Sequence, residues 1–119
     1  MKNQPFHLVL RLIFDEFDIE NDYIAARLDR CPSRIRHWKS DSYPSRKLLS
    51  PLISEINNCI SNNATDIQRT TFKTTLLTTL KENKHDLASN IKNHAASEDD
   101  ISKIVEYTLR SLYPQRSPQ

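Results

Sequence analysis

The sequence predicts an all-α protein, because its apolar residues recur at helical spacing, several prolines stand where helices begin or end, and glycine is absent. A chain of 119 residues is long enough for one packed core and too short for two comfortable ones. The lack of glycine excludes the phosphate-cradling loop, the dinucleotide fingerprint and the Asn-Gly hairpin.

Two helices are expected before residue 29. The first runs from Pro5 to Phe17, with the proline in its first turn. Its apolar stripe consists of Leu8, Val9, Leu12, Ile13 and Phe17. Acidic residues then mark a loop and the start of a second helix over 23–28, for which Asn21 or Asp22 is available as the N-cap.

Pro32 separates the second helix from a third. A proline cannot continue a helix, but it loses nothing at the first position of the next one. Ile35 and Trp38 then face the core at i, i+3. The side chains expected to face outward are Ser33, Arg34, Arg36, His37 and Lys39. Two helices joined by about three residues, with a small alanine at their crossing, match the plan of a helix-turn-helix.

A fourth helix is expected from Arg46 to Ile60, after a turn over 41–45. Its buried stripe consists of Leu48, Leu49, Leu52, Ile53 and Ile56. Pro51 lies inside it or in its first turn, which predicts either a kink or a late start. Residues 61–64 have the composition of a linker.

The second half is expected to add about three helices. Threonine favours strands, but the spacing of Phe72, Leu76, Leu77 and Leu80 fits a helix over 66–83. A short helix over 86–95 follows, and a last one is capped by Ser97 and ends before residue 114. The inward stripe of this last helix consists of Ile101, Ile104, Val105, Thr108, Leu109 and Leu112.

These patterns divide the chain into a helix-turn-helix domain over 1–60, a helical region over 65–113 and a disordered tail over 114–119. The apolar stripes of the helical region are expected to form an oligomerisation surface, and the alternative is that they only complete the core.

Basic charge is concentrated in one window. Residues 1–23 carry two basic and five acidic side chains, residues 24–47 seven and two, and residues 48–119 eight of each. The net charges are therefore −3, +5 and 0. For such a cluster in isolation, a solvated charged face is the more usual explanation. Its position on the predicted helix-turn-helix favours contact with nucleic acid.

The run Ile24-Ala25-Ala26-Arg27-Leu28-Asp29-Arg30-Cys31-Pro32-Ser33-Arg34-Ile35-Arg36-His37-Trp38-Lys39 resembles the helix-turn-helix of the Cro and phage-repressor superfamily. Its continuation is most similar to the CII-type transcriptional activators of lambdoid phages. The shared features are the Trp-Lys pair, the aspartate two residues later, a proline three beyond that and the following double leucine, which here are Trp38-Lys39, Asp41, Pro44 and Leu48-Leu49. The resemblance covers about residues 5–57.

The resemblance implies which side chains contact DNA. Base-reading positions fall on Pro32, Ser33, Arg36 and His37. Phosphate-contacting positions fall on Asn21, Arg34, Lys39, Ser42, Arg46 and Lys47. Arg36 is the strongest candidate, because arginine can bond guanine at two points. The alternative for His37 is a solvated surface histidine without a role in binding. Trp38 is expected in the core.

The sequence departs from the family's pattern around the turn. Asp29 and Asp41 stand where the family often has glycine, Arg30 replaces an apolar residue, and Cys31 is a poor cap. Aspartate enters the left-handed backbone region with modest strain. A positive φ at Asp29 or Asp41 would therefore mean that the aspartate stands in for glycine.

The function expected is a sequence-specific, double-stranded DNA-binding regulator of phage or mobile-element type, with activation slightly favoured over repression. It would act as a homodimer or homotetramer, with RNA polymerase as a further partner. The alternative is an antitoxin or adaptor in which the helix-turn-helix is secondary and the C-terminal half binds a partner protein.

No enzyme, metal site or cofactor is expected, because no spacing suggests a nucleophile with its base or a ligand set. The apolar run over 6–14 is interrupted by Arg11 and lacks a cleavage site, so neither a signal peptide nor a membrane span is expected. A cytoplasmic location follows, with Cys31 and Cys59 expected as buried free thiols in preference to a disulfide.

Overall fold

The computed structural model describes residues 5–82 and 101–114, which form helices and no strand. The helices are α1 (Pro5–Glu16), α2 (Asn21–Leu28), α3 (Pro32–Trp38), α4 (Arg46–Asn63), α5 (Asp66–Glu82) and α7 (Ile101–Leu112). The all-α prediction is confirmed for these residues. The expected helix over 86–95, the Ser97 cap and the tail beyond residue 114 lie outside them.

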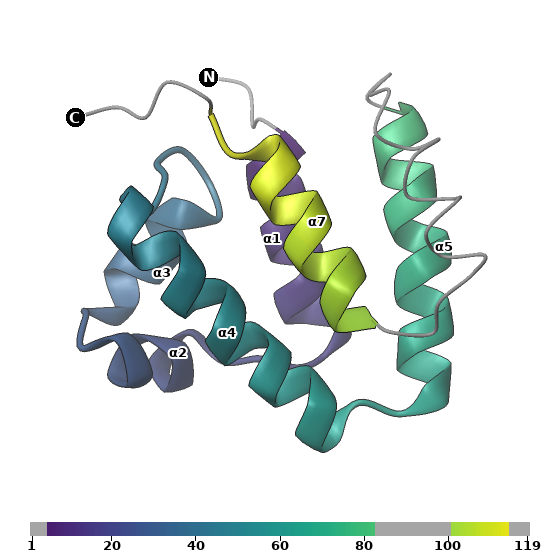
Figure 1. Cartoon of the computed structure of the whole chain (residues 1–119), viewed down its shortest axis with the longest axis horizontal. Coiled ribbons are helices and arrows are strands. Elements are labelled where there is room, and N and C mark those ends of the chain that lie inside the picture. The colour runs from purple at the N-terminus through teal and green to yellow at the C-terminus, as the bar shows by residue number, and fades with distance from the viewer. Residues whose placement is uncertain (1–4, 83–100, 115–119) are drawn as a thin grey trace.

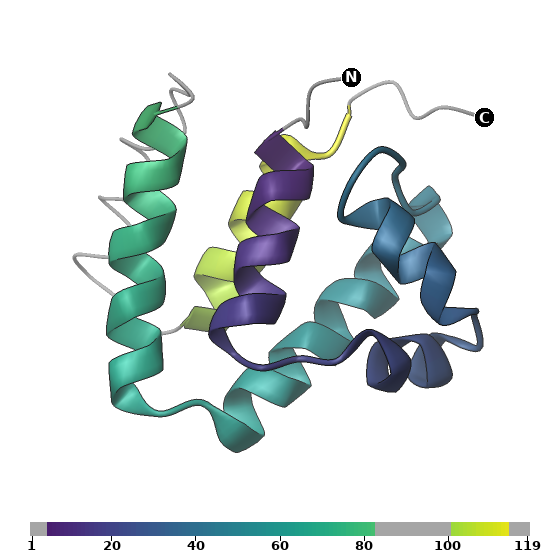
Figure 2. The ribbon, with the colours of Figure 1, turned by 180° about the vertical axis from the view of Figure 1, so that it is seen from behind.

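Helices α1 and α7 lie side by side at the centre of the molecule (Figure 1). Helix α5 packs against α1 on one side, and α4 packs against α7 on the other. Helices α2 and α3 pack on each other, with α2 also against α4. The view from behind shows α1 between α5 and the α2–α3 pair (Figure 2). No helix in the described part of the chain is long and apolar enough to cross a membrane.

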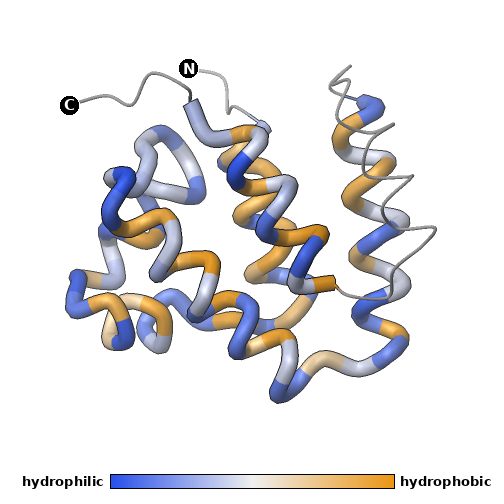
Figure 3. The backbone as a smooth tube through the Cα atoms, viewed as in Figure 1, coloured by the Kyte–Doolittle hydropathy of each residue, from blue (hydrophilic) through white to orange (hydrophobic). Residues whose placement is uncertain are grey.

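Helix α1 is buried around most of its circumference because other helices flank it on both sides. Its buried residues are Phe6, His7, Val9, Leu10, Ile13 and Phe14, and Phe17 follows just after the helix. The predicted stripe is therefore partly wrong: Leu8 and Leu12 are only half-buried. Hydrophobic segments recur along the helices (Figure 3).

The apolar stripes of the C-terminal helices belong to the same core. Phe72, Leu76 and Leu80 of α5 are buried in it. The stripe of α7 is buried as predicted, through Ile101, Ile104, Val105, Thr108 and Leu109, and Leu112 is half-buried. Of the two roles expected for these stripes, completion of the core is the one that the described residues show.

Helix α4 is longer than predicted. It continues to Asn63, so residues 61–63 are helical and the predicted linker is wrong there. The buried side chain of Ile60 adds a further apolar contact at this end, which favours continuing the helix. The helix begins at Arg46, which excludes a late start, and the exposed Pro51 lies inside it.

Two aspartates end helices in the left-handed conformation that usually requires glycine. Asp29 has φ 57° and ψ 50°; its N–H bonds the Ala26 carbonyl at 3.3 Å, while the N–H of Arg30 bonds the Ala25 carbonyl at 2.9 Å. This is the Schellman arrangement. Asp18, with φ 55°, ends α1 in a similar way. Asp41 does not have a positive φ, so the expectation holds for Asp29 alone.

Two local expectations are corrected. The N-cap of α2 is Glu20, which makes no side-chain capping bond, and Asn21 is already helical. The cysteines are free thiols, but Cys31 is exposed and Cys59 is only partly buried. Cys31 is exposed because it lies in the turn that precedes α3, outside the core. The prediction of buried thiols is therefore wrong.

Glycine at position 29 should stabilise the protein. We expect Asp29→Gly to raise the free energy of unfolding by about 0.5 to 1 kcal/mol, because glycine adopts the left-handed conformation without the Cβ clash. Ala26→Gly, three residues earlier in the same helix, should lower it by about 1 kcal/mol. Urea denaturation of both variants measures this, and a loss of stability in Asp29→Gly would contradict the assigned role of Asp29.

Candidate nucleic-acid interface

Helices α2 and α3 pack against each other at the position where the sequence predicts a helix-turn-helix. Residues 29–31 join them, with Asp29 left-handed and Cys31 extended. Pro32 is the first residue of α3, as predicted. Ile35 and Trp38 are buried, with exposed fractions of 0% and 2%. Because α3 has only seven residues, these two side chains and the turn determine its position against the core.

The outer face of α3 carries the four predicted base-reading residues. Ser33, Arg36 and His37 are exposed, and Pro32 is half-buried at the start of the helix. The Nδ1 of His37 lies 3.5 Å from a carboxylate oxygen of Asp41, so the two form an ion pair when the imidazole is protonated. The structure therefore brings the predicted base-reading residues together on one helix.

Lys39 points inward, contrary to the prediction that it faces outward. Its ammonium donates a hydrogen bond of 2.8 Å to Oδ1 of Asn21 and lies 4.5 Å from the centre of the Phe14 ring. Burial lowers the pKa of Lys39. The contact connects the end of α3 with the start of α2 and with α1. Asn21 and Lys39, both predicted to contact phosphates, thus bond each other.

The remaining predicted phosphate contacts surround the start of α4. Arg34, Arg46 and Lys47 are exposed, and Ser42 is half-buried in the loop between α3 and α4. A groove of about 550 Å³ separates these elements. It is lined by Arg30, Arg34, Trp38, Asp41, Ser42, Tyr43, Pro44, Ser45 and Leu48. The basic side chains and hydroxyls at this junction are suited to bind anions.

Basic side chains lie at the N-terminus of α4. Ser45, its N-cap, makes no side-chain capping bond, and the first turn contains no acidic residue. Arg46 and Lys47 instead add positive charge where the helix dipole is already positive. An anion at this position would lower the electrostatic energy of the helix.

Two other arginines of the basic window are used within the protein. Arg27 pairs with Glu55 of α4 at 3.1 Å, and this contact raises the pKa of the guanidinium. Arg30 donates to the carbonyls of Asp29 and Leu28 at 2.8 Å and 3.4 Å. By contrast, the side chains of Arg34, Arg36 and Lys47 make no hydrogen bond or ion pair with any described residue.

Sequence reasoning missed the support behind α3. The ring of His7, in α1, is 2% exposed, and its Nδ1 lies 2.9 Å from the carbonyl oxygen of Trp38. Tyr43 lies against His7, and burial raises its pKa. No periodicity distinguishes His7 from a surface histidine, because its partner is 31 residues away. Within residues 5–82 and 101–114, no cluster of His, Cys, Asp or Glu could hold a metal ion.

The two lysines at this site should differ in their effect on stability. Lys39→Ala should lower the free energy of unfolding by about 1 to 2 kcal/mol, because it removes a hydrogen bond and buried methylene groups. Lys47→Ala should change it by less than about 0.5 kcal/mol, because that side chain is exposed. Thermal or urea denaturation distinguishes the two, and equal effects would contradict the internal role of Lys39.

Comparison with known protein families, with curated proteins and with solved structures finds no match to this chain.

Proposed function

We propose that this protein is a sequence-specific, double-stranded DNA-binding transcriptional regulator that reads DNA with α3. The observation that carries the proposal is a group of three exposed cations, two on α3 and one, Lys47, in the first turn of α4. Arg34, Arg36 and Lys47 have no partner among the described residues, whereas Arg27 and Lys39 in the same window are bonded internally.

The shape of α3 fits the major groove. An α-helix with its side chains is about 10–12 Å in diameter, and the major groove is about 12 Å wide. With Ile35 and Trp38 buried, the outer face presents Arg36 and His37 to a bound duplex. A guanidinium there can bond both acceptors of a guanine, and an imidazole can bond a single acceptor.

The start of α4 supplies the phosphate contacts. Backbone N–H groups in the first turn of a helix attract anions, and this attraction adds to that of Arg46 and Lys47. Arg34 extends the positive surface along the groove between α3 and α4. These contacts place the protein on the DNA backbone without selecting a sequence, whereas α3 makes the selection.

One short recognition helix reads too few base pairs to find a unique site. We therefore propose a homodimer or homotetramer whose subunits read half-sites spaced by helical turns of DNA. The resemblance to CII-type activators favours activation over repression, with RNA polymerase as the partner. No cofactor is required by this mechanism.

Binding to duplex DNA should weaken steeply with salt. We count three phosphate contacts per chain, from Arg34, Arg46 and Lys47. A plot of the logarithm of the binding constant against the logarithm of the salt concentration should then have a slope of about −3 for each bound chain. Fluorescence anisotropy with a labelled duplex of random sequence, from low to moderate salt, measures the slope. No detectable binding at low salt would exclude the proposed function and leave the adaptor alternative.

Arg36 and Lys47 should affect recognition differently. The assays use one duplex selected from a random pool and one unselected duplex. Arg36→Ala should weaken the binding free energy by about 1 to 3 kcal/mol for the selected duplex alone. Lys47→Ala should weaken both duplexes alike and reduce the salt slope by about 1.

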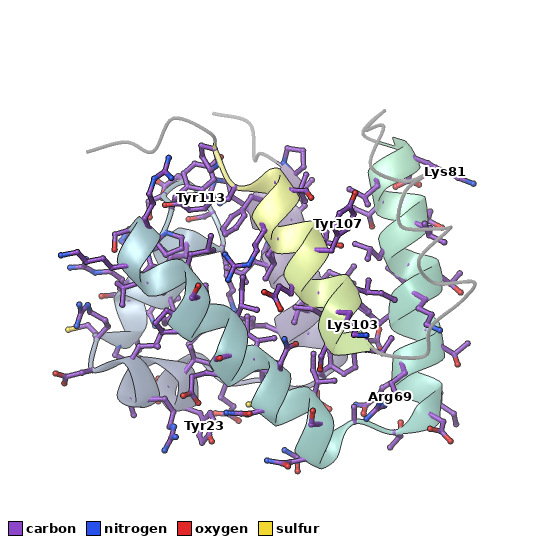
Figure 4. The ribbon with its side chains drawn as sticks, in the orientation of Figure 1. Tyr23, Arg69, Lys81, Lys103, Tyr107 and Tyr113 are labelled. Atoms are coloured by element: carbon purple, nitrogen blue, oxygen red, sulfur yellow. The ribbon has the colours of Figure 1, made fainter. Side chains whose placement is uncertain are left out.

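The control is Lys81→Ala, at the far end of α5 from the helix-turn-helix (Figure 4). It removes the same charge as Lys47→Ala and should leave binding to both duplexes unchanged. A loss equal to that of Lys47→Ala would show that overall charge, rather than this surface, determines affinity.

A further inference from the structure

The exit of α3 is held from behind by a buried polar side chain of α1. His7 and Thr108 are the two buried polar residues of the described part of the chain. The Nδ1 of His7 lies 2.9 Å from the Trp38 carbonyl. Because a carbonyl oxygen only accepts hydrogen bonds, Nδ1 carries the proton and donates it.

This bond satisfies a carbonyl that the helix itself leaves without a partner. The last carbonyls of a helix lack intrahelical donors. In α3, the Ile35 and Arg36 carbonyls accept from the N–H of Lys39, and the His37 carbonyl accepts from the N–H groups of Ser40, Asp41 and Ser42. The Trp38 carbonyl accepts from His7. A buried carbonyl without a donor would cost about 1 to 3 kcal/mol.

Aromatic contacts restrict the His7 ring and the loop that follows α3. Tyr43, in that loop, lies 4.6 Å from the His7 ring and 5.2 Å from the Phe6 ring, measured between centroids. The hydroxyl of Tyr113, at the end of α7, donates a 2.6 Å hydrogen bond to the Pro44 carbonyl (Figure 4). Residues 38–44 are therefore attached to both central helices.

Arg36 and His37 directly precede the residue that His7 holds. Helix α3 has fewer than two full turns, so it has little stiffness of its own to keep its last turn in place. A movement of the Trp38 carbonyl therefore moves the two base-reading side chains. A displacement of about 1 Å is enough to break a two-point hydrogen bond to a base edge.

We propose that His7 is a positioning residue for base recognition: through its hydrogen bond to the Trp38 carbonyl, it holds the last turn of α3 at the depth and angle that discriminate between DNA sequences. The inference rests on the proposed function, and it assigns specificity to a residue that DNA never touches. Phosphate contacts from Arg46 and Lys47 do not depend on this bond. Loss of the bond should therefore reduce discrimination between DNA sequences and leave the affinity for unselected DNA unchanged.

The test compares His7→Leu, which removes the donor, with His7→Asn, whose amide nitrogen replaces Nδ1. The first measurement is the ratio of affinities for a selected and an unselected duplex. His7→Leu should reduce this ratio tenfold or more while binding the unselected duplex within about twofold of wild type. His7→Asn should restore most of the ratio. If His7→Leu does not fold, the pair His7→Asn and His7→Gln makes the same comparison, because the glutamine donor lies one bond too far out.

The second measurement needs no DNA. Amide hydrogen exchange should be faster at Lys39 and Ser40 in His7→Leu than in wild type, and normal in His7→Asn, with the amides of α7 as the internal reference. Ile104→Val and Leu76→Ala are the core controls, because they remove buried volume from α7 and α5 and not from α3. They should lower stability without changing the affinity ratio.

The outcomes separate the two proposals. Wild-type protein that binds no duplex overturns the proposed function and the role of His7 with it. Wild-type protein that discriminates, together with a His7→Leu variant that discriminates equally well, overturns the role of His7 alone. The same conclusion follows if the core controls lose as much discrimination as His7→Leu, or if His7→Asn fails to restore it.

Discussion

The burial of Ile35 and Trp38 is the contact on which the candidate DNA-binding surface depends. A helix of seven residues is not stable in isolation, so the position of α3 is set by what its inner side touches. Those contacts are apolar at Ile35 and Trp38 and polar at the Trp38 carbonyl, where His7 donates. With the inner side fixed in this way, Ser33, Arg34, Arg36 and His37 are left on the outside.

The basic window illustrates how the same residue type serves two purposes. Arg27, Arg30 and Lys39 each bond a protein acceptor and hold elements together. Arg34, Arg36 and Lys47 are exposed without such an acceptor in the described structure. The net charge of a segment does not separate these groups, because the separation depends on which carboxylates, carbonyls and amides lie nearby after folding. In this chain the exposed group lies on α3 and in the first turn of α4.

The turn between α2 and α3 could be predicted because its determinants are local. Pro32 marks the first position of α3, and aspartate is one of the few residues other than glycine that tolerates the conformation of Asp29. The inward residues of α4, α5 and α7 followed largely from their periodicity. The end of α4 was misplaced, because the polar residues 61–63 resemble a linker and the helix is extended by the tertiary contact of Ile60.

The internal contacts of the site could not be predicted from local pattern. His7 bonds a residue 31 positions away, and Lys39 bonds one 18 positions away, so neither contact leaves a periodic signal. Lys39 is expected on the outside because Ile35 and Trp38 take the inward positions of α3, yet its ammonium lies over the Phe14 ring. Asp18 also has a left-handed backbone conformation. It is one of five acidic residues between positions 15 and 22, and nothing in the sequence distinguishes it from the other four.

The most direct test of whether α3 and the start of α4 bind DNA is a titration of ¹⁵N-labelled protein with a duplex, followed by the amide chemical shifts. At low salt, an unselected duplex should shift the amides of Ser42, Tyr43 and residues 45–47, and a selected duplex should add shifts over residues 33–37. Shifts confined to α5 and α7, or no shifts with either duplex, would contradict this assignment.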